Sequence, residues 1–244
     1  MSFDLDGLVG RLTAVPGVVA VTLGGSRATG ENAPDADWDI GVYYERSLDT
    51  DAIRAWGWAG EVFEPGDWAG FMHGGAWLHH DGHKIDLIYR EISEVDRWID
   101  AAAEGEWELS RVPGYLAGMP SYTLAAELAL GQTLSGTVPS AEFTDALAGS
   151  AERRWRWEAE FALTHARFHL DRTDHTLTRG FVVFALLALA HGRLAAHYEW
   201  VRNEKGLLEK AALAPAGNRF DLIAEQHGMK AAVAWVAESL DLTR

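Results

Sequence analysis

A glycine pair followed by a serine ends the first strongly apolar run of this chain. The run Val18–Leu23 is rich in β-branched residues, which favours a strand, and Gly24, Gly25 and Ser26 follow it directly. Glycines permit a tight turn with accessible backbone N–H groups. If Ser26 opens a helix, its hydroxyl group and the positive end of the helix dipole point toward the same anion. The segment therefore predicts a strand, a turn and a helix start that together hold a phosphate group.

Two aspartates follow at a spacing that suits a strand. Asp37 and Asp39 flank Trp38 in a segment of strand composition that runs to Tyr43. Because side chains alternate along a strand, both carboxylates are expected on one face of the sheet. Mg²⁺ prefers hard oxygen ligands and is usually held by one or two carboxylates together with substrate phosphates. The pair therefore predicts a magnesium site beside the phosphate-binding turn, of the kind that promotes nucleotidyl transfer.

A third aspartate lies in a later alternating segment. Lys84, Asp86 and Ile88 alternate with apolar residues, and the segment follows another apolar run across Asp81-Gly82, a favoured two-residue hairpin turn. We therefore expect Asp86 on a strand that neighbours the aspartate pair. There it serves either as a further metal ligand or as the base that accepts a proton, and the sequence leaves both roles open.

These residues together resemble a known family. The order of an apolar residue, Gly-Gly-Ser, Asp-x-Asp and a later acid, over residues 23–90, is similar to that of the nucleotidyltransferases of the DNA polymerase beta superfamily. The resemblance implies a Mg²⁺-dependent enzyme that uses ATP as co-substrate. It places the nucleotide phosphates at Gly24, Gly25 and Ser26. Arg27 either assists phosphate binding or is an exposed arginine of the first helical turn.

Composition divides the chain near residue 120. Before this point short apolar runs alternate with Gly and Pro turns, and after it helical patterns dominate, over 122–134, 141–147, 151–170 and 178 to about 203, with caps at Ser140 and Thr178. We therefore predict an α+β chain. A small mixed-sheet nucleotidyltransferase domain spans 1–120, and a helical, substrate-binding bundle spans 121–244.

The two parts differ in net charge. Residues 1–120 carry 8 Lys and Arg against 21 Asp and Glu, and most of the net charge of −15 lies there. Such a domain repels nucleic acid, whose binding depends on Lys and Arg, and attracts a cationic acceptor. The acidic residues from Glu61 to Asp67 and from Glu104 to Glu108 are the expected contributors. An alternative is that the acidic composition serves only solubility.

The plan of the whole chain resembles two-domain antibiotic-modifying enzymes, especially the streptomycin and spectinomycin adenylyltransferases. This resemblance implies that Lys205 binds the nucleotide phosphates, although a lysine there also suits a helix terminus. It implies transfer of AMP to a hydroxyl group of a small cationic molecule such as an aminoglycoside-type antibiotic. Glu127, in the first predicted helix of the second part, is an alternative base.

Three classes of function remain open. The first is a small-molecule adenylyltransferase, favoured by the two-domain plan and the acidic first half. The second is a nucleotidyltransferase that modifies a protein hydroxyl group or a tRNA end, as in toxin–antitoxin systems. The third is a non-catalytic nucleotide-binding regulator.

The remaining features favour a cytoplasmic protein. The chain has no cysteine, so it contains no disulfide bond and no thiolate metal site. No apolar run reaches the eighteen residues of a membrane span, and the first residues are acidic, unlike a signal peptide. His73, His79, His80 and His83 lie close in sequence, but hairpin alternation sends His79 and His80 to opposite faces, which argues against a zinc site.

Overall fold

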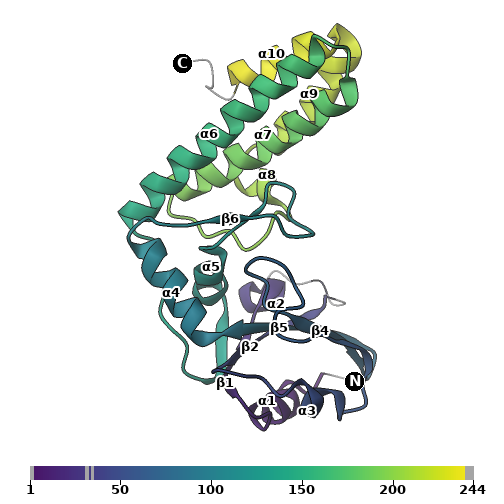
Figure 1. The fold of residues 1–244 in the computed structure, drawn as a ribbon. Coiled ribbons are helices and arrows are strands. Elements are labelled where there is room, and N and C mark those ends of the chain that lie inside the picture. Colours follow the sequence, from purple (N-terminus) through teal and green to yellow (C-terminus); the bar gives the residue numbers. More distant parts are fainter. Residues whose placement is uncertain (1–2, 31–32, 34–35, 240–244) are drawn as a thin grey trace. The chain divides into compact units, whose positions relative to one another are not determined.

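The computed structural model describes residues 3–30, 33 and 36–239. In chain order its elements are α1 (Leu5–Thr13), β1 (Val18–Leu23), α2 (Gly25–Thr29), β2 (Trp38–Tyr44), α3 (Thr50–Arg54), β3 (Ala59–Val62), β4 (Gly75–His80), β5 (His83–Glu91), α4 (Ile92–Ala103), β6 (Leu109–Ser110), β7 (Met119–Pro120), α5 (Thr123–Leu130), β8 (Gln132–Gly136), α6 (Asp145–Leu170), α7 (His175–Ala196), α8 (Leu207–Lys210), α9 (Ala214–His227) and α10 (Met229–Ser239) (Figure 1). The predicted α+β class, with a mixed sheet and a helical C-terminal part, is confirmed.

A six-stranded sheet with the order β3-β4-β5-β2-β1-β8 forms the framework of the first part. Strands β2 and β5 run parallel, and the other neighbouring strands are antiparallel. The predicted hairpin joins β4 to β5, and both turn residues have positive φ, 49° at Asp81 and 80° at Gly82. This is the backbone that a two-residue hairpin needs to match the twist of its strands. Strand β5 therefore lies between β4 and β2, as a neighbour of the Asp-x-Asp strand.

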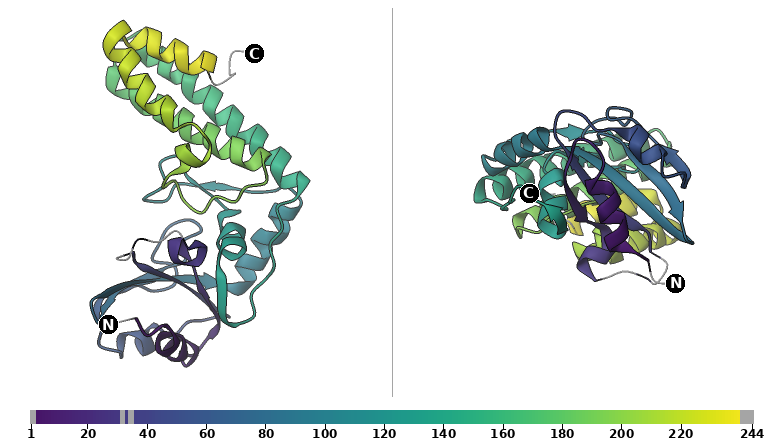
Figure 2. Two further views of the ribbon diagram at one scale, coloured as in Figure 1. Left: turned by 180° about the vertical axis from the view of Figure 1, so that it is seen from behind. Right: turned by 90° about the horizontal axis from the view of Figure 1, so that it is seen from below.

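The two faces of the sheet have different partners. One face carries Ile40, Ile85 and Leu87, which pack with Leu8 and Leu12 of α1 in the larger apolar core. On the other face Ala20 and Tyr43 form a smaller core with Val95 of α4, against which side chains of α4 and α5 pack. Figures 1 and 2 show α1 and α3 together on the first face. Because side chains alternate, Asp39 and Asp86 belong to the second face.

The chain divides into two compact units at points that differ from the predicted boundary at residue 120. The first unit comprises Met1–Ala102, Trp107–Val112 and Met119–Glu142, and the second comprises the remainder. Residues 121–142 join the first unit because β8 pairs with the edge strand β1. The expected helix over 122–134 is accordingly wrong beyond Leu130, since the chain turns at Gly131 and continues as β8. Local composition does not reveal this long-range pairing.

The second unit is built on α6 and α7, which run side by side (Figure 2). Thr144, rather than Ser140, caps α6, and the two predicted helices over 141–147 and 151–170 are one helix of 26 residues. Helix α7 is capped by Asp174 rather than by the predicted Thr178. It ends at Ala196, before the predicted end near residue 203. By length and composition α7 is apolar enough to cross a membrane, but it packs along α6 as a core helix does.

His191 of α7 is a core residue of this unit. Its ring stacks on Trp155 of α6 with the centroids 4.4 Å apart. Burial lowers the pKa of His191 to about 4, so the side chain is neutral near pH 7.

Candidate active site

The two strands that carry the aspartates lie next to each other in register. Asp39 of β2 is the direct partner of Asp86 of β5, and both side chains are half-buried on the same face of the sheet. Asp37 comes immediately before β2, and its Oδ1 lies 4.0 Å from Nζ of Lys84 at the start of β5. The structure therefore brings the three predicted carboxylates to one end of the β2–β5 pair.

The glycine turn lies against Asp39. The N–H group of Gly24 donates to the carbonyl oxygen of Asp39 at 2.8 Å, so this N–H is used within the protein. Gly25 has a φ of +61°, and a Cβ added there would collide with Oδ2 of Asp39 and lie 2.7 Å from its Cγ. The close approach of a carboxylate and the left-handed backbone both require glycine at position 25. The turn and the Asp39 carboxylate thus form one unit.

Helix α2 directly follows the turn after β1 and has only five residues. It begins at Gly25, with Gly24 as its cap, and ends at Gly30 in the left-handed conformation. Gly25 rather than Ser26 therefore opens the helix, and Ser26 is its second residue and is half-buried. The predicted phosphate site thus consists of a tight turn followed by a single helical segment, beside Asp39.

Arg27 has partners that the sequence did not reveal. Its Nε donates to the carbonyl oxygens of Ala36 at 3.2 Å and Asp37 at 3.1 Å, and its guanidinium group lies 4.1 Å from the ring centroid of Trp38. These contacts fasten α2 to the chain that enters β2. Arg27 therefore holds the backbone of Asp37 in place through its carbonyl oxygen. A contact between Arg27 and phosphate stays a prediction.

Glu127, the alternative base, is bound to a buried arginine. Arg90 of β5 is fully buried, and its Nε and its terminal nitrogen bind the two carboxylate oxygens of Glu127 of α5 at 2.7 and 2.6 Å. The bidentate pair ties α5 to the sheet. The same charges act on Tyr43, although burial is the main cause of the raised pKa of its hydroxyl group. This arrangement argues that Glu127 has a structural role.

We expect Glu127→Gln to lower the free energy of unfolding by about 3 kcal/mol, because it leaves the buried charge of Arg90 without its partner. Transfer activity of the folded variant should stay within about threefold, whereas loss of a general base costs about 100-fold or more. Urea denaturation and initial rates measure both quantities. Asp51→Asn, which removes an exposed pair with Arg54, is the matched control and should cost less than about 1 kcal/mol. Unchanged stability with lost transfer would restore Glu127 as the base.

His73 and His80 of the first unit have structural partners. His73 is buried, its Nδ1 accepts the N–H of Glu91 at 3.2 Å, and its Nε2 lies 2.7 Å from a carboxylate oxygen of Glu94. Burial is the main cause of the lowered pKa of His73. His80 stacks on Trp58 at 4.0 Å. Among the described residues no three His, Asp or Glu side chains are placed to hold a metal ion by themselves, the three aspartates included, so a metal ion at the aspartates would need further ligands from a bound nucleotide.

An aromatic cluster that the sequence did not place borders the carboxylates. Trp77 of β4 is the direct cross-strand partner of Asp86 and is 49% exposed. Its ring centroid lies 5.0 Å from that of Phe63 and 5.4 Å from that of Trp68. The three residues are dispersed over fifteen positions of sequence, so their contact is seen only in the fold. The pairing of Trp77 with Asp86 places the cluster beside the carboxylates.

Lys205 belongs to the second unit. It is exposed and lies in the segment between α7 and α8, where its backbone N–H donates to Oδ1 of Asn203 at 3.0 Å. The neighbouring Glu204 binds the N–H groups of Leu116 and Ala117 at 2.6 and 2.7 Å. Glu204 thereby anchors the segment, while the role of Lys205 stays a prediction.

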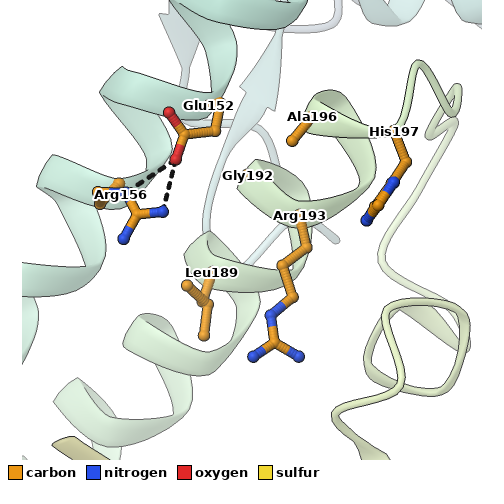
Figure 3. A pocket seen from close by; sticks show the side chains of 7 residues that line it. All are labelled: Glu152, Arg156, Leu189, Gly192, Arg193, Ala196 and His197. Carbon is orange, nitrogen blue, oxygen red and sulfur yellow. Dashed lines mark hydrogen bonds and ion pairs between the residues drawn. The ribbon is translucent and has the colours of Figure 1, made fainter. Parts of the chain in front are cut away.

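The second unit also contains a cavity of about 220 Å³ between α6 and α7 (Figure 3). Its polar walls come from the paired Glu152 and Arg156 of α6 and from Arg193 and His197 at the end of α7. Two guanidinium groups against one carboxylate make a lining of positive character. A cationic acceptor is therefore not the ligand that this cavity favours.

Comparison with known proteins identifies the first unit. Residues 8–107 match the family model described as nucleotidyltransferase domain. The prediction made from the Gly-Gly-Ser and Asp-x-Asp motifs is thereby confirmed for this part of the chain, which is a nucleotidyltransferase domain. The match contains every predicted site residue except Lys205 and the alternative base Glu127.

Two solved structures resemble the chain at low sequence identity. A nucleotidyltransferase-like protein from Exiguobacterium sibiricum shares 10% identity with a TM-score of 0.44, covering 97% of this chain and 73% of that one. An aminoglycoside 6-adenyltransferase from Bacillus subtilis shares 12% identity with a TM-score of 0.32, covering 97% and 85%. These similarities are too weak to assign either protein's substrate to this chain. No curated protein matches the sequence.

Proposed function

We propose that this chain, with its nucleotidyltransferase domain at residues 8–107, transfers AMP from ATP to a hydroxyl group of a small cationic molecule in the cytoplasm. The observation that carries the proposal is the contact between the glycine turn and the aspartate strand. Gly25 lies against the carboxylate of Asp39, and Asp39 lies in register beside Asp86. The turn that we propose as the phosphate site is thus adjacent to a pair of carboxylates.

The donor set fits Mg²⁺. Asp37, Asp39 and Asp86 offer only carboxylate oxygens, which are the ligands that this ion prefers, and one or two of them suffice when substrate phosphates complete the coordination. Asp37 and Asp39 would hold the ion together with the phosphates, and Asp86 would either join them when nucleotide is bound or act as the base. When bound, Mg²⁺ supplies positive charge that offsets the charge of the triphosphate.

The remaining chemistry belongs to residues of the chain. The turn at Gly25 and the hydroxyl group of Ser26 would hold the phosphates, with Lys205 and Arg27 as further proposed contacts. The acceptor oxygen forms a bond to the α-phosphorus, and the bond from that phosphorus to the bridging oxygen breaks and releases pyrophosphate. The hydroxyl proton passes to the carboxylate of Asp86 if that residue acts as the base.

Replacing Asp86 tests this assignment and separates its two roles. We expect Asp86→Asn to lower the transfer rate by about 100-fold or more. Titration with Mg·ATP then distinguishes the roles, because loss of a base leaves nucleotide binding intact and loss of a ligand weakens it. Asp96→Asn, which removes an exposed carboxylate from α4, is the control and should leave both quantities unchanged. Unchanged turnover in Asp86→Asn would remove this residue from the reaction.

A further inference from the structure

Phe63, Trp68 and Trp77 form a cluster on the first unit that we call the aromatic platform. Trp68 and Trp77 are inclined by only 30°, and Phe63 meets Trp77 edge-on at 75°. Gly75 makes room for the platform, since a Cβ there would lie 2.6 Å from the ring of Trp68. Trp77 remains half-exposed although it is a large apolar side chain on β4, a strand with neighbours on both sides. An aromatic surface left open beside carboxylates is suited to a ligand.

Strand register places the aromatic platform on the face of the carboxylates. Directly paired residues of neighbouring strands point to the same face, with Cβ atoms about 5 Å apart. Trp77 pairs with Asp86, and Asp86 pairs with Asp39. On the outer side Trp77 pairs with Glu61 of β3. One row across the sheet therefore reads Glu61, Trp77, Asp86 and Asp39.

The order of the strands indicates from which side of the carboxylates the acceptor approaches. The phosphate-binding turn follows β1, which borders β2 on one side, whereas the platform lies beyond β5 on the other side. In an in-line displacement the attacking and leaving oxygens lie on opposite sides of the phosphorus. If pyrophosphate leaves on the side of the turn, the acceptor approaches from the side of Asp86 and Trp77. The platform thus lies where the acceptor must be held.

Chemistry at the platform favours a ring that carries an amine. The C–H groups of a sugar ring and a nearby ammonium group are both attracted to the negative face of an indole ring. Glu61 is exposed beside Trp77 and forms no ion pair with any residue that the structure describes, whereas Glu64 is bound to Arg54 and Thr50. Glu61 is therefore available to a cation.

We propose that the aromatic platform, together with Glu61, forms the acceptor-binding site, in which Trp77 packs against a ring of the acceptor and Glu61 binds an amine that this ring carries. The inference rests on the proposed function, because it uses the side on which pyrophosphate leaves. It also identifies which part of the acidic domain meets the acceptor. The adenine base is assigned to the other side of the carboxylates, with the phosphate turn.

Calorimetric titration of the full chain with three probes tests the proposal. The probes are kanamycin, which has amine-bearing rings, raffinose, which has rings without amines, and spermidine, which has amines without rings. Each is titrated in the presence of Mg²⁺ and a non-hydrolysable ATP analogue. We expect kanamycin to bind most tightly, with a Kd that rises with salt because the attraction to Glu61 is screened. Equal affinity for spermidine, or no binding of kanamycin, would overturn the proposal.

Variants then locate the binding. Trp77→Ala should raise the Kd of kanamycin about tenfold or more and Trp77→Phe should retain part of the affinity, because a ring remains. Glu61→Gln should raise the Kd about threefold or more and weaken its salt dependence. Trp157→Ala, at an exposed tryptophan of α6, and Asp6→Asn, on α1 across the sheet, are the controls and should have no effect.

The ATP analogue itself serves as the second readout. Its Kd should stay within about twofold in Trp77→Ala, since the platform holds the acceptor. If Trp77→Ala weakened the nucleotide as much as kanamycin, the platform would bind adenine. If it weakened neither, the cluster would only pack the hairpin, and either result overturns the inference. The proposed function is tested separately, because it fails if Asp39→Asn leaves Mg-dependent binding of the analogue unchanged.

Discussion

Asp39→Asn is expected to lower the rate of nucleotidyl transfer by about 1000-fold or more while the protein remains folded. The change keeps the shape of the side chain and removes the charge that holds the metal. Metal binding contributes several kcal/mol to transition-state stabilisation, and about 4 kcal/mol corresponds to this factor. Asp39 is half-buried, and asparagine has nearly the same volume, so the substitution opens no cavity. Asp37→Asn is expected to act in the same direction.

Single-turnover kinetics at saturating Mg²⁺ measure this effect, and urea denaturation confirms that the variant is folded. The control is Asp81→Asn, which removes a carboxylate from the exposed turn between β4 and β5. Asparagine suits the positive φ of 49° at this position. Near wild-type rates in Asp39→Asn would exclude the aspartate pair from the reaction.

The two neighbouring glycines of the turn should respond very differently to the same change. In Gly25→Ala the new methyl group collides with Oδ2 of Asp39, and a φ of +61° costs alanine about 1 kcal/mol. Since the collision displaces a proposed metal ligand, we expect transfer to fall about 100-fold or more. In Gly24→Ala the new Cβ would lie at ordinary distances, 3.5 Å from the carbonyl oxygen and 3.6 Å from Cβ of Asp39. Its activity should stay within about threefold.

The pair is informative because both variants add one methyl group to the same turn. Initial rates and the midpoint of thermal unfolding separate loss of activity from loss of stability. Equal effects in the two variants would show that the approach of Gly25 to Asp39 does not matter for transfer.

The local features of the first unit were predictable because short-range chemistry determines them. The strand before Gly24, the Asp81-Gly82 turn and the strand with Asp86 all depend on residues within a few positions of each other. The sequence also predicted that the strand of Asp86 neighbours the strand of the aspartate pair, whereas the register that places Asp39 directly beside Asp86 is known only from the structure. Residue types at this site therefore indicated its chemistry before the fold was known.

Long-range contacts account for what the sequence did not reveal. Strand β8 joins β1 across more than a hundred residues, which moved the end of the first unit from 120 to Glu142. The ion pair of Arg90 with Glu127 links residues 37 positions apart and removed the reason to treat Glu127 as a base. The position of the aromatic platform beside the carboxylates depends on the pairing of β4 with β5 and of β5 with β2. Such partners are set by the packing of the whole unit.

The nature of the transferred group is tested most directly with ATP labelled at either the α- or the γ-phosphate, in parallel reactions with kanamycin and Mg²⁺. The account predicts that the α-label becomes attached to the acceptor and that the γ-label is released in pyrophosphate. It also predicts that neither label is transferred in Asp39→Asn. Attachment of the γ-label, or attachment of the α-label that persists in Asp39→Asn, would contradict nucleotidyl transfer at this site.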